Sequence, residues 1–206
     1  MTWQGWWCPG KLQRSLRHDE EEAERSARAL LAVMARQLGR NDLDCVHVLD
    51  IGCGVKITQA LVNDGLPIGS YTGVDVSASV IDFLRSSVDD PRFACHHVDF
   101  HNARYNPTGV KMGPDAVLPV ERADFDLICG FSLVTHLAPD DTKSILEISA
   151  RYAHDRTRWC SPPSSTSTPR RPRTGRPVLA GVGRRRQLGA AIPGLRRRRR
   201  ITGGAL

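Results

Sequence analysis

The stretch V-L-D-I-G-C-G, residues 48–54, decides the fold of this chain. It completes an apolar run that starts at Cys45, and such a short run predicts a buried strand. Gly52 and Gly54 follow directly, so the backbone can turn tightly there and approach a ligand closely. Residues 56–63 are typical of a helix. A strand, a glycine turn and a helix in this order predict a ligand site at the carboxyl end of the strand.

Strands and helices alternate on both sides of this motif. We expect a further helix at residues 19–38. A second begins at Ser77, which is its expected N-cap. A third, with Asp140 or Asp141 as N-cap, extends to about Tyr152. We expect further strands at 70–76, 92–98 and 126–130, with a long connection at 101–122 that is rich in turn residues. This alternation predicts an α/β fold, with a doubly wound, mostly parallel sheet and helices on both faces.

An acidic residue stands at or just after the end of three successive predicted strands. Asp50 lies within the glycine motif, Asp75 ends the next strand and Asp99 follows the third. In nucleoside-binding α/β domains, a carboxylate in the position of Asp75 accepts hydrogen bonds from both ribose hydroxyls. Each acid alone is also compatible with a helix cap or a solvated loop. Together the three predict one rim of a nucleoside site.

These motifs resemble those of the class I S-adenosylmethionine-dependent methyltransferases over about residues 29–153. The resemblance rests on V-L-D-I-G-C-G, on Y-T-G-V-D at 71–75, on V-D-F at 98–100 and on F-D-L-I-C-G-F-S-L-V-T-H-L at 125–137. It implies that S-adenosylmethionine is the cofactor. It also implies the contacts. Asp50 and the loop Gly52, Cys53, Gly54 would hold the methionine part, and Asp75 would hold the ribose. Asp99 would bind the adenine amino group with Phe100 beside the adenine ring, and the backbone of Cys129 and Gly130 would lie beside the sulfonium. Val76, next to Asp75, is a further candidate for cofactor binding.

The resemblance implies transfer of a methyl group to a small-molecule acceptor. Because the sulfonium is already an activated leaving group, such a protein chiefly aligns the reactants and sometimes removes a proton. His136 follows the fourth predicted strand and is a candidate general base, with a structural role in its loop as the alternative. We expect no metal site, because the cluster of His96, His97 and His101 lacks a cysteine or carboxylate at a clear ligand spacing.

Two other functions stay open. An NAD-dependent oxidoreductase also places an acid after the second strand, but its G-x-G-x-x-G pattern requires a glycine where Ile57 stands. A non-catalytic remnant, or a binding module with a basic tail, is favoured by two features. Lys56 replaces the third glycine of the methyltransferase pattern D-x-G-x-G-x-G, and no later segment is typical of the family's C-terminal strands. Lys56 would either crowd the methionine carboxylate, and so weaken cofactor binding as we predict, or pair with that carboxylate.

The C-terminal segment differs sharply from the rest of the chain. The net charge is +7, but all acidic residues precede residue 156, and the segment after it holds arginine without lysine. We expect an N-terminal segment and helix at 1–40, a cofactor-binding domain at 41–154 and a disordered tail rich in Arg, Pro and Gly at 155–206. The C-terminal strands of the family are then missing. The tail is either a basic arm or an out-of-frame reading of a GC-rich gene, and its lack of lysine favours the second account.

The basic charge does not by itself predict a nucleic-acid partner. The surplus lies wholly in the tail, and the remaining residues are acidic on balance, so we expect a small-molecule acceptor rather than a nucleic acid. No segment approaches the ~18–20 apolar residues of a membrane span. The absence of a signal-peptide pattern at the N-terminus predicts a cytoplasmic location. Nothing in the sequence indicates an oligomeric state.

Overall fold

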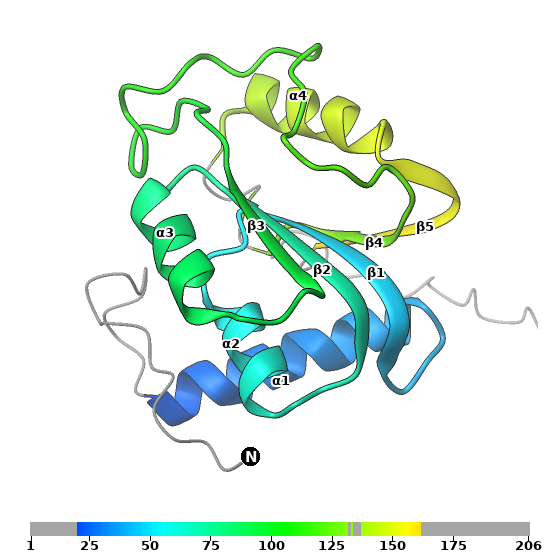
Figure 1. Ribbon diagram of the computed structural model, residues 1–206. Helices are drawn as coiled ribbons and strands as arrows, with labels where there is room; N and C mark the ends of the chain where they lie inside the picture. The colour runs from blue at the N-terminus through cyan, green and yellow to red at the C-terminus, as the bar shows by residue number, and fades with distance from the viewer. Residues whose placement is uncertain (1–19, 132, 134–136, 162–206) are drawn as a thin grey trace, which may run out of the picture. The chain divides into compact units, whose positions relative to one another are not determined.

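The computed structural model describes residues 20–131, 133 and 137–161. In them, five parallel strands form one sheet in the order β3-β2-β1-β4-β5 (Figure 1). The strands are β1 (Leu43–Ile51), β2 (Ile68–Asp75), β3 (Phe93–His97), β4 (Phe125–Cys129) and β5 (Ala153–Cys160). The helices are α1 (Glu20–Gln37), α2 (Lys56–Asn63), α3 (Ala78–Ser87) and α4 (Pro139–Ala150). The predicted α/β fold is confirmed.

Both faces of the sheet are covered. Helices α1, α2 and α3 pack on one face, against alternate strand residues such as Val48 and Tyr71. Helix α4 and the connection after β3 pack on the other face, against Leu49 and Val74 (Figure 1). Adjacent residues of one strand thus point into different cores, as the two-residue period of a strand requires. The sheet is doubly wound, as predicted.

The central strand β1 positions the glycine motif. It pairs with β2 on one side and β4 on the other, so the strand order reverses next to it, where ligands bind in such sheets. The turn after β1 is fastened to β2, because the amides of Gly52 and Cys53 both donate to the carbonyl of Val74, at 2.8 and 3.1 Å. Gly52 and Gly54 have φ of +72° and +53°, a left-handed conformation that favours glycine.

Strand β5 corrects the predicted end of the sheet. Residues 155–160 were expected to belong to a disordered tail, but they continue a strand in register with β4, in which Cys160 pairs with Cys129. The strand lies at the edge of the described sheet and most of its residues are exposed, so it carries no apolar run that predicts a strand. The rest of the predicted tail, 162–206, lies outside the described residues.

The start of α4 also differs from its prediction. Ala138 is the N-cap, Pro139 is the first helical residue, and Asp140 and Asp141 lie in the first turn rather than at the cap. Proline suits this position because its ring fixes φ and its missing amide hydrogen has no helical partner there. The two carboxylates still stabilise the helix dipole at its N-terminus. Ser77 is the N-cap of α3, as predicted.

No helix in the described part of the chain is both long and apolar enough to cross a membrane.

Candidate functional site

A cavity of about 350 Å³ lies at the carboxyl ends of β1, β2 and β3, and α1, α2 and the connection after β3 contribute to its wall. Its volume falls within the range of ~300–1,000 Å³ that is common for small-molecule sites. It contains most of the cofactor-binding residues predicted from the sequence. These are Asp50, Gly52, Cys53, Gly54, Asp75, Val76 and Phe100.

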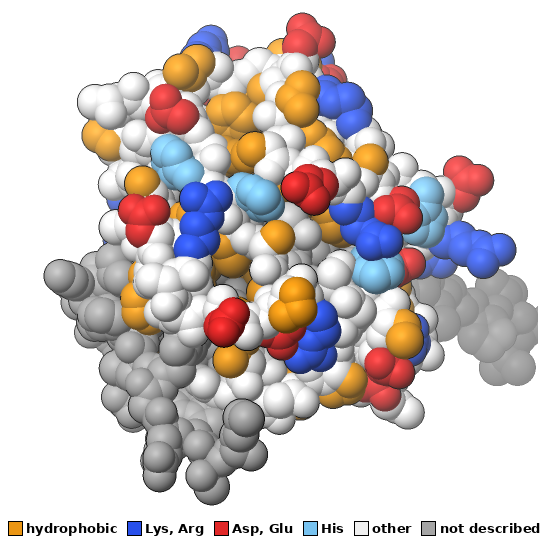
Figure 2. All heavy atoms as spheres, viewed as in Figure 1, with side chains coloured by type: hydrophobic (Ala, Val, Ile, Leu, Met, Phe, Trp, Pro, Cys, Tyr) orange, Lys and Arg blue, Asp and Glu red, His pale blue; other side chains and the backbone are white. Residues whose placement is uncertain are grey.

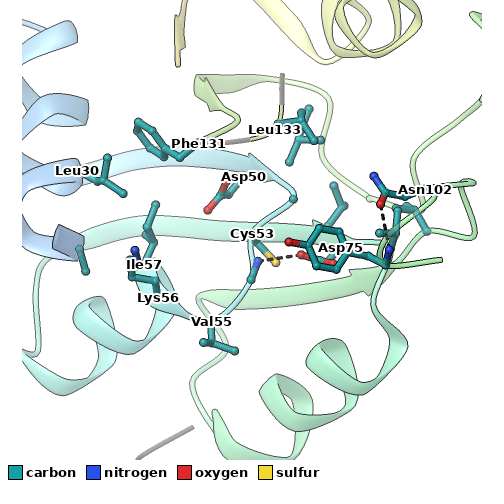
Figure 3. Close-up of a pocket in the computed structure, with 18 of the residues that line it drawn as sticks. Leu30, Asp50, Cys53, Val55, Lys56, Ile57, Asp75, Asn102, Phe131 and Leu133 are labelled. Atoms are coloured by element: carbon teal, nitrogen blue, oxygen red, sulfur yellow. Dashed lines mark hydrogen bonds between the residues drawn. The ribbon is translucent and has the colours of Figure 1, made fainter. Parts of the chain in front are cut away.

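The carboxylate of Asp75 ties two elements of the site together. The amide of Gly54 donates to Oδ2 at 2.9 Å (Figure 3). The amide of Ser77 donates to Oδ1, also at 2.9 Å. The residue is only 1% exposed. A buried carboxylate is costly unless donors satisfy it, and here two backbone amides do so. Asp75 therefore holds the glycine turn against the start of α3, and its orientation in the cavity wall is fixed.

Asp50 lies in the floor of the cavity, where a buried tyrosine holds it. The hydroxyl of Tyr71 donates to Oδ2 of Asp50 at 2.7 Å, and neither residue is more than 1% exposed. Burial, together with the nearby charge of Asp50, raises the pKa of Tyr71 well above its ordinary value near 10. Burial and Asp50 likewise raise the pKa of the Cys129 thiol. Tyr71 therefore stays protonated and continues to donate to Asp50.

The glycine motif and the acid at the end of β2 lie in a segment that matches a known family. The sequence model of a family described as methyltransferase domain matches residues 48–155, about half of the chain. The chain belongs to the class I methyltransferase family. The solved structures to which the chain is similar resemble it only distantly.

A complex of a Haloferax volcanii methyltransferase with the activator Trm112 is 18% identical, over 67% of this chain and 54% of that chain, with a TM-score of 0.43. PKMT2 from Rickettsia typhi, in complex with AdoHcy, is 19% identical over 62% of this chain and 23% of that chain, with a TM-score of 0.43. A TehB-like S-adenosylmethionine-dependent methyltransferase from Corynebacterium glutamicum is 21% identical over 69% of this chain and 73% of that chain, with a TM-score of 0.44. The chain thus spans about half of the length of the first of these structures and about a quarter of the second.

Three predicted residues of the methyltransferase site do not line the cavity. The exposed carboxylate of Asp99 accepts a hydrogen bond from Nδ2 of Asn106 at 2.9 Å. Cys129 and Gly130 are buried beneath the site, and the amide of Gly130 donates to the carbonyl of Cys160 at 3.1 Å. His136, the candidate base, lies outside the described residues.

Several lining residues were missed in the sequence. Leu30 on α1 and Phe131 and Leu133 after β4 form an apolar part of the wall (Figure 3). Asn102 lines it after β3, and its Oδ1 accepts the amides of Arg104 and Tyr105, both at 3.0 Å. The apolar stretch after β4 was quoted for its resemblance, but its side chains were not assigned. The remaining lining residues after β3 lie in the long connection, where no periodic pattern indicates which side chains point inward.

Ile57 occupies the position where a dinucleotide-binding motif has its third glycine. The residue lies in the first turn of α2, is buried and belongs to the core shared by α1 and α2. In dinucleotide-binding folds, that glycine permits close packing of the helix on the strand. A branched side chain here fills that space, and the local geometry therefore differs from the NAD-binding motif.

Proposed function

We propose that this methyltransferase domain binds S-adenosylmethionine in the cavity and transfers its methyl group to a small-molecule acceptor. The observation that carries the proposal is the convergence of Asp50, the Gly52–Gly54 turn and Asp75 on one cavity. A small acceptor is also supported by the face of the described residues that Figure 2 shows, because acidic and basic side chains are interspersed there and form no single-sign patch for a nucleic acid.

The donors and acceptors of the cavity fit this cofactor. Asp75 offers carboxylate oxygens to a ribose diol, and Asp50 offers a negative charge to the ammonium of the methionine part. Val76 and Phe100 give apolar surface for the adenine, with the amide side chain of Asn102 beside them. We propose that the adenine ring binds to this part of the wall rather than to Asp99, because the Asp99 carboxylate already accepts a hydrogen bond from Asn106.

Methyl transfer requires no covalent intermediate with the protein. When bound, S-adenosylmethionine supplies a sulfonium-activated methyl group. The glycine turn and the two acids orient the donor, which brings the methyl group into line with the acceptor. Phe131 and Leu133 exclude water from the part of the cavity next to β4. His136 stays our proposed general base for an acceptor that must lose a proton. The cytoplasmic location also stays a proposal.

The alternative of a non-catalytic remnant has lost part of its support. It rested on the missing C-terminal strands and on Lys56, and β5 supplies one of those strands. The NAD-dependent alternative requires a glycine where Ile57 stands, and the Ile57 side chain is buried in the core of α1 and α2. We therefore propose no second function.

Isothermal titration calorimetry of the full chain with S-adenosylmethionine, S-adenosylhomocysteine and NAD tests the proposal. We expect both adenosyl ligands to bind and NAD not to bind. Asp75→Asn replaces one acceptor oxygen by a donor and should weaken both ligands more than tenfold. Asp82→Asn on the exposed surface of α3 is the matched control and should leave both affinities unchanged. Binding of NAD alone, or of no ligand, would overturn the proposal.

A further inference from the structure

Lys56 places a positive charge at the glycine turn, where the methyltransferase pattern has no side chain. It is the first residue of α2, and its side chain lines the cavity. Its ammonium donates to Oγ of Ser26 on α1 at 3.3 Å. Within the described residues, no carboxylate forms an ion pair with this ammonium. Lys56 thus brings to the cavity wall a charge that has no neutralising partner in the described part of the chain.

The two arginines that line the same cavity are placed differently. Arg28 on α1 donates to both carboxylate oxygens of Asp64, at 2.7 and 2.8 Å, and lies 3.7 Å from Glu24. Two acids therefore neutralise its charge. The guanidinium of Arg104 lies 5.2 Å from the centre of the Tyr105 ring, in the connection after β3. Of these three basic residues of the cavity wall, Lys56 is the one that lies next to the glycine turn and has no acidic partner among the described residues.

The two ends of the cavity differ in charge. Lys56 lies beside Ile57 at the end near Leu30, whereas Asp75 and Asn102 lie at the opposite end (Figure 3). The first turn of α2 contains no acidic residue, and a lysine there is unfavourable next to the positive end of the helix dipole. An anionic group at this end would relieve that repulsion. A ligand with a diol at Asp75 and a carboxylate toward α1 matches both ends.

We propose that Lys56 binds the carboxylate of the methionine part of S-adenosylmethionine, and that Ser26 holds the lysine in position for it. This inference rests on the proposed function. Of the two expectations for Lys56, the contact with Ser26 favours pairing over crowding, because the side chain is directed to α1 and not across the turn toward Asp75. The chain thus uses a charged side chain at a position where its family uses a glycine.

Calorimetry with two ligands tests the pairing. The first is S-adenosylhomocysteine, and the second is its decarboxylated analogue, which keeps the adenosine, the sulfur and the amine. We expect Lys56→Gln to lower the affinity for S-adenosylhomocysteine about tenfold, as loss of a charge-assisted hydrogen bond does. The same substitution should change the affinity for the decarboxylated analogue less than about twofold, because that ligand has no carboxylate to lose a partner. Lys56→Gly should behave like Lys56→Gln.

Lys111→Gln is the matched control, since Lys111 is exposed and lies outside the cavity wall, and it should change neither affinity. Equal losses for both ligands in Lys56→Gln would overturn the pairing, and so would tighter binding of S-adenosylhomocysteine by Lys56→Gly, which crowding predicts. Failure of the proposed function looks different, because the unchanged protein would then bind neither ligand.

Discussion

The hydrogen bond between Tyr71 and Asp50 gives the sharpest test of how the sheet supports the cavity. Tyr71→Phe removes one hydroxyl and leaves the ring that packs in the core, 5.7 Å from the ring of Phe93. Asp50 then loses a donor that lies 2.7 Å from its Oδ2 in a site sheltered from water. We expect both the stability of the protein and its affinity for S-adenosylhomocysteine to fall.

The size of the effect follows from the contact that is lost. A hydrogen bond to a carboxylate contributes about 1.5–3 kcal/mol, so the free energy of unfolding should fall by that amount. For a domain of this size, a loss of ~2 kcal/mol lowers Tm by roughly 5–10 °C. Asp50 becomes less well oriented toward the ligand ammonium, and we expect an affinity loss of about fivefold, which corresponds to ~1 kcal/mol.

Urea denaturation and calorimetry measure the two effects separately. Tyr152→Phe is the matched control, since Tyr152 is also a buried tyrosine, but its hydroxyl accepts the amide of Leu118 at 2.8 Å in the opposite core. Both variants should be less stable, but Tyr71→Phe should lose more affinity. If Tyr71→Phe binds S-adenosylhomocysteine as tightly as the unchanged protein, or if both variants lose affinity equally, Tyr71 does not position Asp50 for the ligand.

Three further predictions concern thiols and the glycine turn. Burial raises the pKa of several thiols above the ordinary value of 9.0, that of Cys95 to about 11. The unfolded chain therefore loses these protons first. For Cys95, urea titrations should show stability falling by ~1.4 kcal/mol per pH unit between about pH 9 and about pH 11. Gly52→Ala forces a side chain into φ +72° and to 3.3 Å from Leu133, and chemical denaturation should show a loss of ~1–2 kcal/mol. In a Cys8→Ser background, Cys45 should react first with a thiol reagent, and the remaining described thiols should react only on unfolding, because they are buried.

Periodic elements were predicted well from the sequence, and the edge of the sheet was not. Helix α2 has the bounds predicted for it, since a glycine turn precedes it and Gly65 follows it closely. Strand β5 was missed because an edge strand buries few side chains, so a polar sequence can form it. Its only fully buried residue is Cys160. Thr157 supports the strand instead, by donating from Oγ1 to the carbonyl of Phe125 at 2.6 Å.

The candidate site was predicted at the level of strands but not of every side chain. Asp99 stands between Val98 and Phe100, which both line the cavity. Because side chains alternate in extended backbone, a residue between two inward ones points away. The same alternation places Cys129 in the core under α1 and α2 rather than in the cavity. The acids themselves gave no such signal, because a carboxylate at a strand end suits both a ligand contact and a loop contact.

The charges of the cavity discriminate between the ligands that a Rossmann-like site can hold. In a dinucleotide site, the glycine turn receives a pyrophosphate, which carries negative charge. Here the same turn lies next to the carboxylate of Asp50, which is only 1% exposed, and such burial weakens the screening of its charge by water. In the orientation that we propose, a zwitterionic amino-acid group would meet no such repulsion, because its ammonium would face Asp50 and its carboxylate would extend toward Lys56. The carboxylate of Asp50 therefore favours S-adenosylmethionine over NAD on electrostatic grounds that are independent of the glycine spacing, whereas an acid at Asp75 suits either ligand.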